Sequence, residues 1–206
     1  MKKHILTILF FGGLWGGCEA LLGEALYSRH VPHAGFYLTV VGFFILAVSR
    51  SFVRWTGAAT LIAVSAMLYK FLNVPFFACH LAGISLLGVA WDLSWNVGKI
   101  RSSVLASTVA VYLGHAFFMF AMVFAFRSDR WVAQGLRGWI DHVGVSGSLT
   151  AVACAVLVPL GLMWGARLQK GVAQPSLRAH RFAPIASLVL TIGLWGYAFA
   201  IGAKLH

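Results

Sequence analysis

The sequence predicts an all-α fold, a polytopic transmembrane helical bundle of six or seven helices with one interfacial amphipathic helix. Of the 206 residues, 60% are hydrophobic and only 10% are charged, whereas a soluble domain is about 25% charged. The lysines and arginines stand mostly in short segments between apolar runs of about 20 residues, which is the length that crosses the hydrocarbon core. We therefore expect a single integral membrane domain over residues 1–206.

Seven apolar runs are the candidate spans. Their predicted bounds are residues 5–27, 35–53, 56–72, 75–95, 104–126, 146–166 and 184–203. The third run is short and is separated from the fourth only by Asn73 and Val74, so the two form a tight hairpin. One member of this hairpin need not cross the bilayer, which is why the predicted count is six or seven.

Lysine and arginine give the chain a formal net charge of +11, but they form no basic stripe or tail of the kind that binds nucleic acid. Their distribution over the loops fits the positive-inside rule, because ten of the 16 fall on one side when the N-terminus is placed in the cytoplasm. We therefore expect a multi-pass protein of a bacterial inner (cytoplasmic) membrane, with a cytoplasmic N-terminus. Its first apolar run should be a retained helix and not a cleaved signal.

The segment over residues 127–143 differs from the spans around it. Trp131, Leu136 and Trp139 recur at helical spacing, and Arg130 and Arg137 lie between them. Tryptophans at headgroup level beside a charged face are typical of a helix that lies in the membrane interface. We expect one such amphipathic helix here.

Glu19 is the sharpest functional signal, because a carboxylate midway along a transmembrane helix is costly and is rarely left unused. Small residues recur around it at spacings of three and four, which places them on one helix face where another helix or a partner protein can approach closely. These packing or partner-contact residues are Gly12, Gly13, Gly16, Gly17, Ala20 and Gly23. Glu19 then either binds a substrate or coupling ion, or forms a hydrogen bond inside the bundle.

Histidines supply the other candidate site residues. His80 and His115 lie inside the fourth and fifth runs, where they could join Glu19 in one substrate-binding cluster or serve as neutral hydrogen-bonding groups between helices. Near the outer end of the first run, Glu24, His30 and His33 could line an entry side or hold a metal or an anion, or could belong to a solvated loop. The cofactor is not specified, and a metal ion held by some of the four histidines is one alternative.

The stretch from Leu14 to Trp95, which opens with LWGGCEALLGEALYSRHVPHAG, resembles small bacterial membrane proteins that are substrate-binding (S) components of energy-coupling factor transporters. The resemblance implies a compact bundle that binds a vitamin or a metal ion. It also implies that small residues spaced by four on the first helix contact a membrane coupling subunit. The seventh run and the segment 127–143 depart from that family's pattern, as does His4, which follows lysines where the nickel and cobalt components carry a histidine motif.

Three functional hypotheses follow. The leading one is a membrane transport component that binds a small solute or metal ion within the bundle and is coupled to a partner protein, since no nucleotide-binding motif is present. The second is a membrane-embedded metal- or haem-dependent enzyme that acts on a lipid or quinone. The third is a structural or assembly subunit that only docks another membrane protein. The leading hypothesis assigns no catalytic residue.

Overall fold

The computed structural model describes residues 2–68, 78–173 and 192–193, and throughout that part of the chain the regular structure is helical, without a strand. The predicted all-α fold is therefore confirmed. The α-helices are α1 (Lys2–Ser28), α2 (Ala34–Arg50), α3 (Ala58–Met67), α4 (Ala78–Asp92), α5 (Ser103–Phe120), α6 (Asp129–Ala133), α7 (Gly135–Asp141) and α8 (Gly147–Ala173). Three π-helical turns continue α4, α5 and α7 at their C-terminal ends: η2 (Leu93–Val97), η3 (Ala121–Ala125) and η4 (His142–Ser146).

Three continuous helical segments among the described residues are long and apolar enough to cross a bilayer: His4–Ser28, Ser103–Ala125 and Gly135–Gly171. Ala34–Arg50 and Ala58–Met67 are apolar but shorter. These segments identify a membrane protein. The predicted seventh span, residues 184–203, lies outside the described residues apart from 192 and 193, as does the connection between the third and fourth runs.

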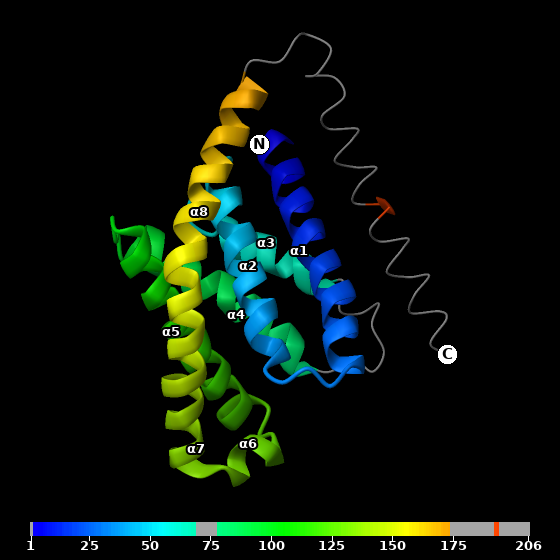
Figure 1. Ribbon diagram of the computed structural model, residues 1–206, viewed down its shortest axis with the longest axis vertical. Coiled ribbons are helices and arrows are strands. Elements are labelled where there is room, and N and C mark those ends of the chain that lie inside the picture. Colours follow the sequence, from blue (N-terminus) through cyan, green and yellow to red (C-terminus); the bar gives the residue numbers. More distant parts are fainter. Residues whose placement is uncertain (1, 69–77, 174–191, 194–206) are drawn as a thin grey trace.

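The helices pack in a continuous arrangement from α1 on one side to α5 and α8 on the other (Figure 1). α1 contacts α2 and α3, α3 contacts α4, α4 contacts α5, and α8 packs against both α2 and α5. Large side chains such as Trp15, Phe43 and Trp91 fill the centre. Figure 1 also shows the N-terminus and the last turns of α8 at one end of the bundle and α6 and α7 at the opposite end.

The segment predicted as one interfacial helix contains two short helices, α6 and α7. They are separated at Gly135, whose φ of 61° is left-handed, a conformation that glycine adopts without steric cost and that ends a right-handed helix. From Gly135 onward, α7, η4 and α8 form one helical segment. The helix that contains the predicted sixth span therefore begins about three turns earlier than residue 146.

Candidate functional site

Glu19 lies midway along α1 and is buried, with 5% of its surface exposed. Its Oε1 accepts a hydrogen bond of 3.4 Å from Nε1 of Trp15, one turn earlier on the same helix. Trp15 is completely buried and lies against Gly42 of α2, where a Cβ would come within 2.6 Å of the indole. Close approach of α2 thus fixes the indole, and the indole orients the carboxylate. Trp15 is not among the residues expected from the sequence, although its spacing of four residues from Glu19 signals such a contact.

The small residues of α1 are packed inside the chain. All six are buried: Gly12, Gly13, Gly16, Gly17, Ala20 and Gly23. A Cβ at Gly12 would collide with the side chain of Ser65 and lie 3.0 Å from the carbonyl oxygen of Ile62, so α3 lies directly against the α1 backbone at this point. This face is used within the bundle, and a partner protein would have to contact α1 at other residues.

His80 of α4 is half-buried and stacks on Tyr27 in the last turn of α1, with ring centroids 5.6 Å apart and an interplanar angle of 17°. Tyr27 is eight residues beyond Glu19, about 12 Å along the helix axis. The structure therefore connects His80 to α1, nearer the end of that helix than Glu19.

His115 of α5 pairs with His142 of η4. Nδ1 of His115 lies 3.3 Å from Nε2 of His142, and the rings are 5.1 Å apart. Nε2 of His115 is buried and has no hydrogen-bond partner in the described chain. Because α5 packs against α4 and α8, whereas α1 packs against α2 and α3, His115 and Glu19 belong to different parts of the bundle. His142 is not an expected site residue, and nothing in the sequence pairs two histidines that are 27 positions apart.

Aromatic rings surround the imidazole pair. Trp131 lies edge-on to His142 at 4.9 Å, and Phe118 lies 6.0 Å from the same ring. Tyr112, one turn before His115, forms a hydrogen bond of 2.7 Å with Ser148 of α8 through its hydroxyl group. The pair is thus held between α5 and the η4–α8 segment in a mostly apolar setting.

Of the predicted entry-side residues, Glu24 lies near the end of α1, and His30 and His33 lie in the turn between α1 and α2. Glu24 is half-buried, whereas His30 and His33 are exposed and have left-handed backbones, with φ of 52° and 58°. Within the described residues, these side chains form no group of three metal-ligand types, and neither do the other histidines.

A separate polar network joins α2, α3 and the end of α4. Oδ2 of Asp92 accepts hydrogen bonds from the backbone nitrogen and the hydroxyl group of Thr60, both at 2.8 Å, and Oδ1 accepts one of 2.8 Å from Asn96. Nη1 of Arg50 donates to Asn96 at 3.1 Å, and the guanidinium lies 4.5 Å above the ring of Trp95. Since Thr60 is in the first turn of α3, Asp92 caps that helix from a neighbouring one.

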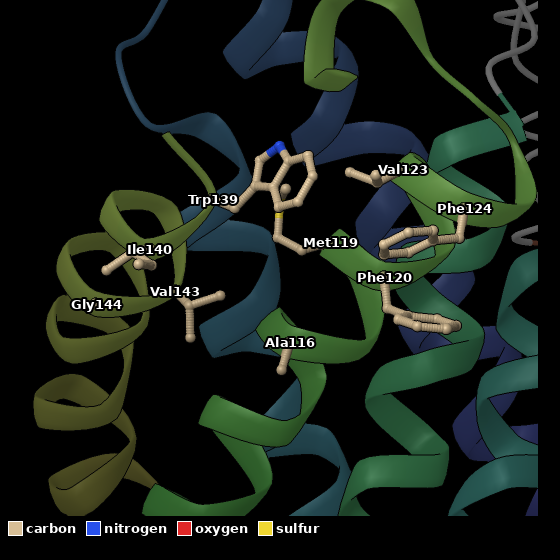
Figure 2. A pocket seen from close by; sticks show the side chains of 9 residues that line it. All are labelled: Ala116, Met119, Phe120, Val123, Phe124, Trp139, Ile140, Val143 and Gly144. Atoms are coloured by element: carbon tan, nitrogen blue, oxygen red, sulfur yellow. The ribbon is translucent and has the colours of Figure 1, made fainter. Parts of the chain in front are cut away.

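A groove of about 460 Å³ opens between α5 and η3 on one side and α7 and η4 on the other (Figure 2). In Figure 2, Phe120 and Phe124 face Ile140 and Val143 across it, and the indole of Trp139 lies next to Met119. Among the described residues, those that line it are Ala116, Met119, Phe120, Val123, Phe124, Trp139, Ile140, Val143 and Gly144.

Three arrangements can therefore carry chemistry: a buried carboxylate oriented by an indole, a pair of imidazoles in an apolar setting, and an apolar groove near the end of the bundle. The first can bind a cation or a proton, the second can hold a metal ion, and the third can hold hydrocarbon. Comparisons with protein-family models, with curated proteins and with solved structures gave no match to this chain.

Proposed function

We propose that the protein is a membrane transport component that binds a small solute or ion at Glu19, within the helical bundle. The observation that carries this proposal is the burial of a carboxylate halfway along a helix long enough to cross the bilayer. A charged side chain at the bilayer centre costs at least about 2.5 kcal/mol on insertion scales. Binding of a cation, an amine or a proton would compensate that cost and would make Glu19 a ligand-binding residue.

The surroundings of Glu19 support this role. The indole of Trp15 holds one carboxylate oxygen, and charge interactions are stronger in this buried setting than in water. A solute that enters from the side of Glu24, His30 and His33 would pass the stacked rings of Tyr27 and His80 before it reaches Glu19. His115, which lies in another part of the bundle, is left out of this proposed site.

Coupling to a partner protein belongs to the same proposal, in keeping with the resemblance of the first half to substrate-binding components of energy-coupling factor transporters. Because the small residues of α1 are buried, the partner would contact the side chains of α1 that remain exposed. Ile5, Leu9 and Leu22 are such residues, with exposed fractions of 52%, 44% and 43%.

Thermal unfolding of the purified protein with candidate ligands tests the binding step. The probes are Ni²⁺, Co²⁺, Zn²⁺ and water-soluble vitamins, the ligand classes that the resemblance implies. A bound probe should raise the Tm of the wild type by about 2–4 °C for each kcal/mol of stabilisation. Glu19→Gln and Glu19→Ala should lose the shift, while Glu24→Gln should keep it. Wild-type uptake of the same probe into proteoliposomes by both Glu19 variants would overturn the proposal.

A second candidate function rests on the imidazole pair. Two nitrogens at about 2.0–2.1 Å from one tetrahedral metal ion lie about 3.3 Å apart, which equals the separation of His115 Nδ1 and His142 Nε2. The protein would then be a membrane-embedded metalloenzyme acting on a lipid or a quinone, with the remaining metal positions left to water or substrate. Metal analysis after reconstitution with Zn²⁺ or Cu²⁺ should give one ion per chain, and His142→Ala should bind none. A wild type that binds neither metal removes this candidate.

A further inference from the structure

The groove between α5–η3 and α7–η4 serves neither Glu19 nor the contacts of α1. We propose that it binds one acyl chain of an anionic phospholipid, whose phosphate interacts with the arginines of the segment over residues 127–143. The proposal does not depend on a transport role of the protein. It rests on the lining of the groove, on three nearby cations and on the local shape of the two helices that form the walls.

The lining of the groove is suited to hydrocarbon. Met119, Phe120, Phe124, Ile140 and Val143 have no hydrogen-bonding group in their side chains apart from a thioether. Among the described lining residues, the only strong side-chain donor is Nε1 of Trp139, and it already donates to the carbonyl oxygen of Trp131 at 2.7 Å. A quinone ring or a sugar would leave its polar atoms unpaired here, whereas an acyl chain has none. The volume of about 460 Å³ is that of an ordinary small-molecule site.

The charges near the groove favour an anionic headgroup. Arg127, Arg130 and Arg137 are exposed. Arg127 follows the η3 wall by two residues, and Arg137 precedes Trp139 by two on α7. None of the three guanidinium groups forms an ion pair within the part of the chain that the structure describes. The guanidinium of Arg130 lies over the ring of Trp131, 5.8 Å from its centroid.

Two carboxylates, Asp129 and Asp141, lie in the same segment, so three positive and two negative side chains leave a net charge of +1. Unpaired guanidinium groups bind phosphate through bidentate hydrogen bonds. Tryptophans such as Trp131 and Trp139 typically mark headgroup depth. An anionic phospholipid therefore matches this region, because its phosphate suits the arginines and its acyl chain suits the apolar groove.

Both walls of the groove include a π-helical turn. Val123 and Phe124 come from η3, and Val143 and Gly144 come from η4. Such turns occur mostly as single irregularities in α-helices and are frequent at functional sites. At Gly144 a Cβ would have no atom within 4 Å, so the groove has open space where a larger side chain could be placed without moving the backbone.

Native mass spectrometry of the purified protein, exchanged into phosphatidylglycerol or phosphatidylcholine, tests the proposal. Each arginine near a headgroup contributes about a fivefold preference for an anionic lipid, and the two carboxylates reduce the total. With a net charge of +1, the wild type should therefore retain one phosphatidylglycerol about fivefold more than one phosphatidylcholine. Equal retention of the two lipids would overturn the headgroup part of the proposal.

Two variants separate the acyl site from the charges. Gly144→Phe should fill the groove and abolish retention of both lipids, while Gly171→Phe, also in open space on α8, should behave as wild type. The combined change of Arg127, Arg130 and Arg137 to Gln should remove the preference but not the retention of phosphatidylcholine. Undiminished lipid retention in Gly144→Phe would overturn the proposal. A wild type that is dimeric while Gly144→Phe is monomeric would also overturn it, because the groove would then be occupied by a second copy of the chain.

Discussion

Asp92 and Glu19 are both buried carboxylates, with exposed fractions of 6% and 5%, but their surroundings differ. Asp92 accepts hydrogen bonds of 2.8 Å from Thr60 and Asn96 and caps the first turn of α3. Glu19 accepts a longer bond from an indole on its own helix. The network of Asp92 therefore explains its burial through the fold.

Replacing Asp92 should therefore lower stability. Asp92→Ala would leave the amide and hydroxyl of Thr60 and the side-chain amide of Asn96 without their acceptor, at a cost of about 3 kcal/mol. Asp92→Asn should lose less stability, because its side-chain oxygen can still accept hydrogen bonds from Thr60. Some loss remains, because its amino group faces the amino group of Asn96, and two donors cannot pair. Denaturant titration in detergent micelles measures both changes. Asp129→Ala, at an exposed position, is the control, and an Asp92→Ala protein as stable as this control would contradict the structural role.

The sequence predicts the helices better than the contacts between their side chains. The first, second and fifth apolar runs match α1, α2 and α5 with η3 within about three residues at each end, because uninterrupted hydrophobic length determines where such helices begin and end. The pairing of His115 with His142 and of Arg50 with Asn96 joins positions 27 and 46 residues apart. Those contacts depend on how the helices pack, which the periodicity of one chain does not specify.

Contact between α1 and α2 depends on Gly42. A Cβ at this position would lie 2.6–2.8 Å from three atoms of the Trp15 indole, so Gly42→Ala must displace either the indole or α2. We expect a loss of about 1–3 kcal/mol from this overpacking, together with altered ligand binding at Glu19, because Trp15 orients that carboxylate.

Gly83→Ala on α4 is the matched control. Its Cβ would lie 3.7 Å from Phe118, an ordinary contact, and alanine favours a helix over glycine by up to about 1 kcal/mol. Thermal unfolding of the two variants should thus give shifts of opposite sign. If Gly42→Ala is as stable as Gly83→Ala, close packing of Trp15 on α2 is not a source of stability.

The arrangement of the chain as a whole leads to a prediction about sidedness. The helical segment Gly135–Gly171 has 37 residues and is about 55 Å long, so it exceeds a hydrocarbon core of about 30 Å. Its two ends should therefore lie on opposite sides of the membrane, with the α8 end on the same side as the N-terminus (Figure 1). From the positive-inside rule we predict that this side faces the cytoplasm.

Labelling with a membrane-impermeant maleimide checks this orientation. Arg137→Cys in α7 should be labelled in intact cells, and Lys170→Cys near the end of α8 should be labelled only after the membrane is permeabilised. The wild type gives the background, because Cys154 is buried and Cys18 and Cys79 are half-buried. Labelling of both variants from the same side would contradict a membrane-crossing segment, and the reverse pattern would invert the orientation.

The contact between Trp15 and Glu19 also provides an optical signal. The emission of an indole responds to a change of charge at its own nitrogen, and Nε1 of Trp15 lies 3.4 Å from the carboxylate oxygen. A cation or proton that arrives at Glu19 should therefore alter the tryptophan fluorescence, and the Trp15→Phe variant isolates that component from the other seven tryptophans. The proposed ligand of Glu19 can thus be sought by spectroscopy before its identity is known.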